Sequence, residues 1–406
     1  MKRKGAQAPF FVDYNLHMTQ SIPDYPGGGI ANLIQSIATA CGAPPHPAAP
    51  CPELALLPAA RLAEARHIVL LVVDGLGRRT LDAGPAPNLR RHLAGTLSSV
   101  FPSTTARAIT TFMTGLAPAQ HALTGWHMQL DEIDQTLAIL PLTPRSPPAR
   151  LPPEELPPRL FDHASLFQRI ARESWVVAPQ SIAGSPFNAW HARGAHGLAY
   201  ATLPEMFGQL AELLTANAPP RYIYAYYPDL DAHSHRYGCD SEQARQTLAA
   251  VDAAFGAFLD EVRGRDAWLL VTADHGFIDS PPERVVCLDD HPQLAALLAR
   301  PLCGEARAAY AYVAAENRPA FEAYVGGRLA HCIDLRHSAD LIAAGWFGPP
   351  PAHPKLAARV GDYTLLMRDN WTIKDWLPGE KRYRMLGVHG GTSADEMRVP
   401  LVAVRV

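Results

Sequence analysis

Continuous apolar runs alternate with amphipathic segments along most of this chain. Three segments, 30–42, 203–218 and 241–264, have helical periodicity. The apolar runs have strand length and are rich in β-branched and aromatic residues: 67–73, 96–101, 174–179, 221–227, 267–273 and 400–406. Uninterrupted apolar strands are typical of sheets buried on both faces. The alternation therefore predicts an α/β fold with a central, mostly parallel sheet and helices on both faces.

The spacing of these elements suggests a division of the chain. We expect residues 1–60 to form an N-terminal extension packed on the core, and residues 61–282 to form the first part of an α/β core. Residues 283–385 have a mixed pattern and are expected to form an inserted cap sub-domain, before the core resumes at 386–406. Residues 141–158 are dense in proline and predict a long surface loop.

Composition narrows the possible functions. The chain has 406 residues, 48% of them hydrophobic, and a net charge of -3, which argues against disorder and a broad nucleic-acid surface. No apolar run reaches the length of a membrane span, and the start MKRKG is not followed by a signal-peptide core, so we expect a cytoplasmic protein. The six cysteines are scattered without a CxxC motif and are expected to be reduced. The sequence does not indicate an oligomeric state.

Acids and histidines follow several of the predicted strands. Asp74 lies in VVDG, Asp274 and His275 lie in TADHG, and His389 lies in the glycine-rich GVHGG. In open α/β sheets, ligands bind beyond the carboxyl ends of the strands, so these remote segments are expected to meet at one edge. Taken singly, VVDG and GVHGG are also ordinary turns, and an Asp in TADHG could simply cap the backbone.

The segment DLDAHSHRYG after residues 221–227 offers two pairs with i, i+4 spacing. These are Asp229 with His233, and Asp231 with His235. Either pair would lie on one face if the segment is helical. Residue types and spacing leave both pairs open.

FPSTTARAITTFMTG carries a candidate nucleophile into a predicted short helix. Thr105 would lie near the N-terminus of that helix, where free N–H groups favour anions. A plain helix-capping role for Thr104 or Thr105 is the alternative. Together, Asp oxygens and His nitrogens without cysteine indicate Zn²⁺, with Mn²⁺ or Fe as alternatives. Two such ions can stabilise the attacking and leaving oxygens of an in-line displacement.

These motifs resemble the alkaline phosphatase superfamily, and most closely its type I phosphodiesterase/nucleotide pyrophosphatase branch. Pro102-Ser103-Thr104-Thr105 followed by Thr114-Gly115 resembles the family's nucleophile segment, and 115–123 resembles the run that follows it. The resemblance covers roughly residues 65–125, 220–280 and 385–406. It implies an alkaline-phosphatase-like fold and hydrolysis of a small-molecule phosphate ester.

The resemblance also implies ligand sets. Thr105 takes the nucleophile position, and one zinc would be held by Asp74, Thr105, Asp274 and His275. The family's Asp-x-x-x-His precedes a basic residue, Tyr and Gly, and here Arg236-Tyr237-Gly238 follows His235. The second zinc would therefore be held by Asp231, His235 and His389.

One position departs from the family pattern. The phosphodiesterases carry Asn three residues after the nucleophile, where it holds a phosphoryl oxygen, and this chain has Ala108. We expect the backbone N–H groups near Ala106, the metals or another side chain to take that role. Arg107 is a candidate for it, although a position on the helix surface is the commoner role for such an arginine. The departure bears on the substrate more than on the reaction type.

We therefore expect a two-zinc phosphodiesterase or nucleotide pyrophosphatase that forms a phosphothreonine. The alternatives are a phosphomonoesterase or phosphonate hydrolase of the same superfamily, or a non-catalytic protein that binds metal or phosphate. A diester would need a groove for its second substituent. Four tryptophans could line one, although ordinary packing is the commoner role: Trp126, Trp190, Trp371 and Trp376.

Overall fold

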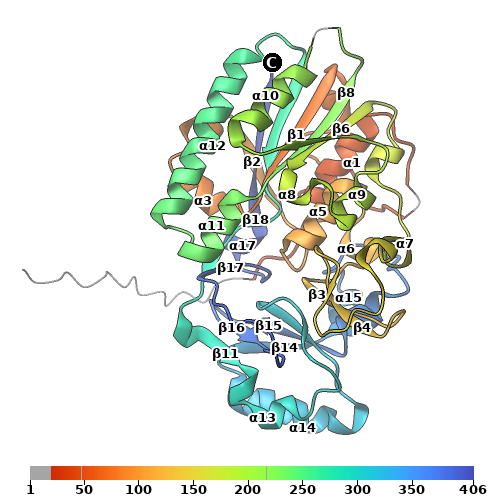
Figure 1. Cartoon of the computed structure of the whole chain (residues 1–406), viewed down its shortest axis with the longest axis vertical. Coiled ribbons are helices and arrows are strands. Elements are labelled where there is room, and N and C mark those ends of the chain that lie inside the picture. The colour runs from red at the N-terminus through yellow and green to blue at the C-terminus, as the bar shows by residue number, and fades with distance from the viewer. Residues whose placement is uncertain (1–19, 47, 216) are drawn as a thin grey trace, which may run out of the picture.

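The computed structural model describes residues 20–46, 48–215 and 217–406. They form two lobes stacked along the long axis of the molecule, and each lobe contains a seven-stranded sheet (Figure 1). Residues 1–19 of the predicted N-terminal extension lie outside the described part. Within that part, no helix has the length and apolar character that crossing a membrane requires.

The larger lobe contains the predicted α/β sheet, with strand order β2-β18-β9-β1-β8-β6-β7. Every neighbouring pair is parallel except those of β18, which runs antiparallel to β9 and β2. Its strands are β1 (His67–Val73), β2 (Leu93–Ser98), β6 (Glu173–Pro179), β7 (His196–Tyr200), β8 (Arg221–Tyr227), β9 (Ala267–Thr272) and β18 (Arg398–Arg405). All residues of β1 and β9 are buried, as the apolar runs predict.

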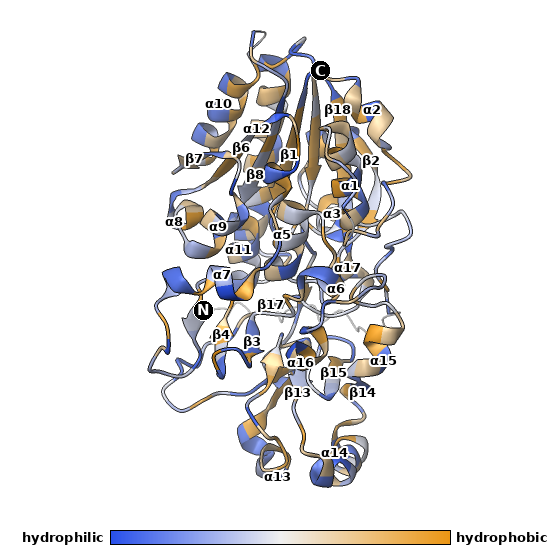
Figure 2. Ribbon diagram, turned by 90° about the vertical axis from the view of Figure 1, so that its right-hand side faces the viewer, coloured by the Kyte–Doolittle hydropathy of each residue, from blue (hydrophilic) through white to orange (hydrophobic). Residues whose placement is uncertain are grey.

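Helices cover both faces of this sheet. α10 and α12 lie on one side, and α1 and α5 lie on the other (Figure 1). The helices of the larger lobe are α1 (Ile30–Ala40), α2 (Ala59–Ala63), α3 (Arg78–Ala83), α4 (Pro87–Arg91), α5 (Thr105–Thr114), α6 (Pro118–His121), α7 (Pro157–Leu160), α8 (Gln180–Ala183), α9 (Pro186–His191), α10 (Leu203–Leu213), α11 (Asp229–Tyr237), α12 (Glu242–Glu261) and α17 (Ala394–Met397). Apolar strands lie between amphipathic helices (Figure 2), which confirms the predicted fold class.

The smaller lobe contains an antiparallel sheet with strand order β14-β15-β13-β12-β3-β4-β5. Its strands are β3 (His127–Leu130), β4 (Gln135–Ala138), β5 (Thr143–Pro144), β12 (Cys303–Gly304), β13 (Ala308–Ala311), β14 (Ile333–His337) and β15 (Tyr363–Met367). The helices and short strand pairs near it are α13 (Pro292–Ala295), α14 (Arg318–Tyr324), α15 (Ser338–Ala343), α16 (Leu356–Val360), β10 (Ile278–Asp279) with β17 (Gly387–Val388), and β11 (Val285–Cys287) with β16 (Thr372–Lys374).

Three strands of the smaller lobe come from an unexpected part of the chain. β3 to β5 precede the predicted cap at 283–385, and β3 joins the sheet because His127 pairs with Gly304 of β12. A pattern read along the chain does not reveal this pairing. The predicted boundaries at 60, 282 and 385 remain predictions.

Two local predictions differ from the structure. β2 ends at Ser98 rather than 101, because the Ser99 N–H bonds to the Met397 carbonyl (2.7 Å) and the chain then turns toward α5. The proline-dense segment 141–158 is largely exposed, but it contains the short β5 and the start of α7. None of the six cysteines forms a disulfide.

The orientation of the sheet determines where ligands can bind. The chain ends after β18 at the top of Figure 1, and β18 runs antiparallel to β9. The parallel strands β1, β8 and β9 therefore end at the opposite edge, which faces the smaller lobe (Figure 1). A cluster of apolar side chains from both lobes, including Phe101, Ala122, Tyr310 and Phe347, packs them together.

Candidate metal and phosphoryl site

The predicted acids lie at the sheet edge that faces the smaller lobe. Asp74 directly follows β1, and its N–H bonds to the carbonyl of Tyr227 at the end of β8 (2.9 Å). Asp274 and His275 follow β9 after one residue, and both are fully buried. Because β1 lies between β8 and β9, three remote segments converge on one point.

One group of side chains surrounds the nucleophile candidate. His275 Nε2 lies 3.5 Å from Asp74 Oδ1, 3.3 Å from Asp274 Oδ2 and 3.2 Å from Thr105 Oγ1. These groups come from β1, β9 and the first residue of α5. The structure thus brings together the four residues of the first ligand set that the family resemblance implies.

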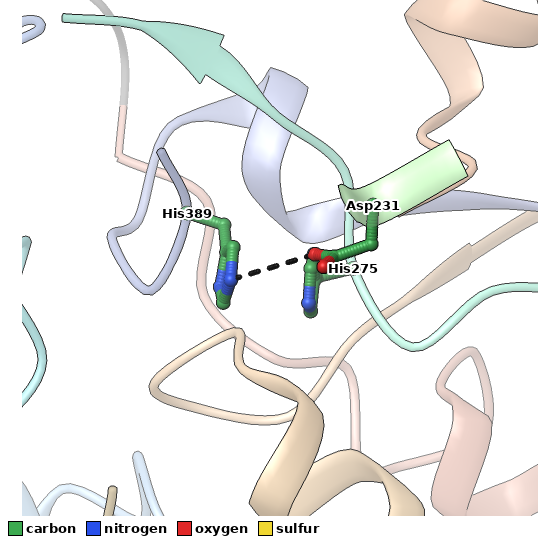
Figure 3. Close-up of side chains that lie close together, drawn as sticks. All are labelled: Asp231, His275 and His389. Carbon is green, nitrogen blue, oxygen red and sulfur yellow. Dashed lines mark ion pairs between the residues drawn. The ribbon is translucent and has the colours of Figure 1, made fainter. Parts of the chain in front are cut away.

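The second group lies beside the first. His235 Nε2 is 3.4 Å from Asp231 Oδ1 and 3.2 Å from His389 Nε2, and His389 Nε2 is 3.9 Å from Asp231 Oδ1. Figure 3 shows the Asp231 carboxylate next to His275 and facing the ring of His389. The rings of His275 and His389 stack with centroids 3.7 Å apart, so the two groups are in direct contact.

His275 belongs to both groups by distance. Ligand atoms of Asp231, His275 and His389 all lie within 4.8 Å of one another, and the same holds for Asp74, Asp274 and His275. The family resemblance places His235 with Asp231 and His389, whereas this geometry also brings His275 toward them. His235 remains at contact distance from both residues.

Backbone carbonyls orient all three imidazole rings. Nδ1 of His235 faces the Gly387 carbonyl at 2.9 Å, that of His389 faces the Ser103 carbonyl at 3.1 Å, and that of His275 faces the Gly276 carbonyl at 3.1 Å. A carbonyl accepts only from a protonated Nδ1, so Nε2 of each neutral ring keeps its lone pair. Metal-binding histidines are held in this way.

The three carboxylates each present one buried oxygen without a hydrogen-bond partner. These atoms are Asp74 Oδ1, Asp231 Oδ1 and Asp274 Oδ2. Their companions are used elsewhere: Asp74 Oδ2 accepts from the Tyr226 hydroxyl, and Asp274 Oδ1 accepts from the N–H groups of Gly75 (3.1 Å) and His275 (3.0 Å). Unpartnered buried oxygens facing imidazole lone pairs are the donor set expected for a cation.

Burial governs protonation in this cluster. It raises the pKa of Asp74 well above its ordinary value, and the charges of Asp274 and Asp231 raise it further. Burial likewise raises the pKa of Asp231 to about 7. Burial lowers the pKa of His235 and of His389, so both rings are neutral near pH 7. Burial thus favours the protonated forms of Asp74 and Asp231 without cations, and divalent ions would displace those protons.

The residues fit two divalent ions by charge as well as by donor type. Three carboxylates and a Thr105 alkoxide would carry four negative charges, which two divalent cations balance. Neutral imidazoles complete the donor set. The mixture of Asp oxygen and His nitrogen suits zinc, as well as manganese or iron.

The structure separates the two candidate pairs of α11. His233 faces the neighbouring helix, with Nδ1 2.6 Å from Thr247 Oγ1 of α12, and Asp229 is exposed at the start of α11. Asp231 and His235 face the cluster. The neighbours of each residue in space, and not the shared spacing, make this distinction.

Thr105 begins α5, where the first N–H groups have no acceptor within the helix. Ala106 is the next residue, so its N–H points toward the same end as Thr105 Oγ1. Arg107 does not lie on the helix surface, nor does it line the cavity described below. It is fully buried, with Nη2 2.9 Å from the Tyr310 hydroxyl and Nε 3.2 Å from the Leu123 carbonyl. Ala108 is also fully buried within α5.

A cavity of about 500 Å³ opens from this cluster into the smaller lobe. Trp126 and Trp376 line it, whereas Trp190 and Trp371 pack elsewhere against apolar clusters. Sequence reasoning missed the charged side chains of its wall beyond the cluster: Arg145, Glu305, Lys374, Asp375, Glu380 and Lys381. They lie on strands or turns of the smaller lobe, and no motif marks them.

Two further residues that support the cluster were missed. Tyr226 could have been found, because strand alternation places it on the same side of β8 as Tyr222 and Tyr224, and it lies nearest of these three to the end of the strand. Glu396 is fully buried and accepts from Arg307 of the smaller lobe at 3.0 and 2.9 Å and from the Gly391 N–H at 2.7 Å. The capping box that begins at Ser393 was the available signal for Glu396.

The fold and this edge of the sheet define the class of protein, an α/β protein of the alkaline phosphatase superfamily. A model of the family "type I phosphodiesterase/nucleotide pyrophosphatase" matches residues 68–392. The chain therefore belongs to this family.

Individual proteins that resemble this chain are consistent with its membership of this family. Bis(5'-adenosyl)-triphosphatase ENPP4 of Bos taurus is 29% identical over 91 residues, which are 21% of this chain and 20% of that protein. The match thus spans about a fifth of this relative's length. Murine ectonucleotide pyrophosphatase/phosphodiesterase 5 has a similar structure, with a TM-score of 0.62 and 17% identity over 83% of this chain and 87% of its own.

A second solved structure with the same fold is phosphonoacetate hydrolase from Sinorhizobium meliloti in complex with phosphonoacetate. It has a TM-score of 0.62 and 18% identity, over 84% of this chain and 91% of its own. At these identities, the structural matches establish the fold alone.

Proposed function

We propose that this chain is a two-zinc phosphodiesterase or nucleotide pyrophosphatase with Thr105 as its nucleophile. One observation carries the proposal: three buried, unpartnered carboxylate oxygens and three oriented imidazoles gather beside Thr105 Oγ1 at the start of α5. One ion would be held by Asp74, Asp274, His275 and Thr105. The other would be held by Asp231, His235 and His389.

The bound ions would supply Lewis acidity, which favours the alkoxide of Thr105 and offsets charge on the phosphoryl group. Thr105 Oγ1 attacks phosphorus in line, the bond to the leaving oxygen breaks, and phosphothreonine forms. A water then attacks phosphorus from the opposite side and restores the Thr105 hydroxyl. The N–H groups of Thr105 and Ala106 point toward the phosphoryl oxygens and stabilise their developing charge. This backbone contribution would replace the Asn that Ala108 does not provide.

The cavity favours a diester over a monoester. A diester has a second substituent that needs space, and a cavity of about 500 Å³ with Trp126 and Trp376 in its wall adjoins the cluster. A monoester dianion would need added positive charge at phosphorus. Arg107 is the arginine nearest to Thr105 in the sequence, but it is buried against Tyr310.

The covalent step is tested with Thr105→Ala and Thr105→Ser. Thr105→Ala should reduce kcat by about a thousandfold or more while bound zinc is retained, and Thr105→Ser should keep measurable turnover. Zinc content by elemental analysis and phosphorus incorporation after rapid quench are the readouts. Undiminished turnover in a zinc-loaded Thr105→Ala protein would exclude the covalent route.

The reaction class is tested with three substrates in parallel: a bis-aryl phosphodiester, a nucleotide 5′-aryl ester and an aryl phosphomonoester, each with zinc added. The diesters should be preferred. A preference for the monoester would replace the diesterase proposal with a phosphomonoesterase. Failure to bind zinc, together with no turnover of any substrate, would favour a non-catalytic binding protein.

A further inference from the structure

Three buried histidines gather beside α5, outside the metal and phosphoryl site, and we call them the histidine cluster. His121 ends α6, His163 follows α7 and His191 ends α9, and each is 8% exposed at most. The ring centroids are 6.4 Å apart between His121 and His163, and 5.3 Å apart between His163 and His191. α6 and α9 both contact α5, the helix that begins with Thr105 (Figure 1).

Hydrogen bonds place one proton on each ring of the cluster. Nδ1 of His191 lies 2.8 Å from the Phe187 carbonyl and donates to it, so Nε2 of His191 accepts. That Nε2 lies 3.2 Å from Nε2 of His163, which therefore donates. Nδ1 of His121 accepts from the backbone N–H two residues later (3.1 Å), so its Nε2–H faces Thr111 Oγ1 of α5 at 3.4 Å. All three rings are thus neutral.

A second proton on any of these rings would lack an acceptor. On Nε2 of His191 it would face the N–H of His163, and on Nδ1 of His121 it would face a backbone N–H. Nδ1 of His163 is buried without a hydrogen-bond partner. A buried donor without an acceptor is costly, and a buried charge costs more. The packing of these rings therefore disfavours the imidazolium form of each one.

Burial lowers the pKa of every ring in the cluster and is the largest cause in each case. From an ordinary value of 6.5, the pKa falls to about 4 for His163 and to about 3 for His191. The pKa of His121 falls well below 6.5, and the two other rings lower it further. These shifts agree with the hydrogen-bond pattern, which has room for one proton on each ring.

The charged groups around the cluster mostly oppose its protonation. The carboxylate of Asp162 raises the pKa of His163, but it is exposed and pairs with His353 at 2.9 Å. Positive groups from α5, from α16, from the turn after α9 and from the loop before α16 lower the pKa of one or more of the three rings: Arg107, Arg359, Arg193 and His353. A proton in the cluster therefore gains little compensation from its surroundings.

We propose that the histidine cluster is an acid-sensitive switch: protonation separates α9 and residues 161–163 from α5 and α6, and α5 then no longer holds Thr105 beside His275. Thr111, which contacts His121, and Thr105 lie on the same ten-residue helix. Separated histidines can be solvated and charged, so the open form binds up to three more protons than the closed form. Opening is thus favoured progressively as pH falls below 6.5 toward about 4.

Hydrogen exchange of the zinc-loaded, full-length protein between pH 7 and pH 5 tests the switch. Protection factors, which correct for the intrinsic pH dependence of exchange, should fall for residues 161–163, 186–193 and 105–114. Each histidine of the cluster should contribute up to about tenfold per pH unit. Turnover should fall together with the protection of α5 and should recover on neutralisation. Zinc content is measured at each pH, so that metal loss is scored separately.

Amide variants remove one titrating group and keep its hydrogen bond. His163→Gln keeps an N–H donor for His191, and His121→Asn keeps an oxygen that accepts from the backbone N–H. Each variant should weaken the loss of protection between pH 7 and pH 5 by about tenfold or more relative to the wild type. His196→Gln is the matched control, because it removes an exposed histidine of β7 and should leave the pH dependence unchanged.

The outcomes separate this inference from the proposed function, on which only the turnover readout rests. Constant protection in the wild type, or the same pH dependence in both amide variants as in the wild type, overturns the inference. Opening of residues 161–163 and 186–193 while α5 stays protected also overturns it. The expected changes in protection without turnover at any pH would retain the inference and reject the hydrolase proposal. Turnover without any change in protection would do the reverse.

Discussion

The two lobes contribute to the site in different ways. The candidate metal ligands gather at one edge of the larger lobe's sheet: they follow β1 and β9, lie on α5 and α11, or come from the loop after β17. The smaller lobe supplies the charged and aromatic wall that a substituent on phosphorus would meet. A parallel sheet aligns strand ends at one edge, so reactive groups gather there irrespective of the substrate. Selectivity then depends on the lobe that faces this edge.

The largest expected effect separates the two faces of α11. Asp231→Asn removes a negative ligand of the cluster and should lower kcat/KM by about a thousandfold, the size seen when transition-state stabilisation is lost. Asp229→Asn is the matched control two residues away, and we expect less than about a twofold change. Steady-state kinetics with a zinc-loaded diesterase assay measure both. Equal losses in the two variants would contradict the assignment of Asp231.

A second test breaks the link between the lobes. Glu396→Gln leaves Arg307 buried without a carboxylate partner, which should cost about 3–5 kcal/mol of unfolding free energy. Because Glu396 also holds the Gly391 N–H, zinc affinity at the nearby His389 should weaken. Denaturant unfolding and zinc titration provide the measurements.

The control for this variant is a surface pair between strands of the smaller lobe. Asp131→Asn breaks the exposed Arg300–Asp131 pair and should cost less than about 1 kcal/mol. If Glu396→Gln were no more destabilising than Asp131→Asn, the buried pair would contribute no more to stability than a surface pair does.

The smallest expected effect concerns stability without metal. The pKa of Asp231 is raised to about 7 in the folded protein, above its ordinary value of 3.8, so folding favours its protonated form. This contribution is fully present below pH 3.8 and is lost as pH rises through about 7. Asp231→Asn does not titrate. Its stability relative to the metal-free wild type should therefore rise by about 1–3 kcal/mol between pH 5 and pH 8.

Thermal unfolding of chelator-treated protein at the two pH values tests this expectation. The two proteins must be compared at each pH because His235 and His389 also titrate. Their lowered pKa values make the folded protein less stable as pH falls, which is opposite to the effect of Asp231. With zinc restored, the order should reverse, since the wild type then binds metal more tightly. A pH-independent difference between metal-free proteins would show that Asp231 is charged throughout.

Local chemistry explains which parts of the site were predictable. Asp74, Asp274 and His275 follow apolar strands directly, and a parallel sheet aligns such positions at its edge. Thr105 lies at the predicted start of a helix, and α5 begins there. Lys374 and Glu305 had no comparable signal, because the pairing of β11 with β16 and of β12 with β3 positions them.

The sequence by itself determined the α/β class, the buried parallel strands and the residue types of a cation site, since hydrophobic periodicity and strand-end position are local properties. Only the tertiary structure decided which side of α11 faces the cluster, where β3 to β5 belong and which charged side chains line the cavity. These depend on contacts between segments more than a hundred residues apart, as with His127 and Gly304. Such contacts contribute to stability only in the folded protein, where the segments lie side by side.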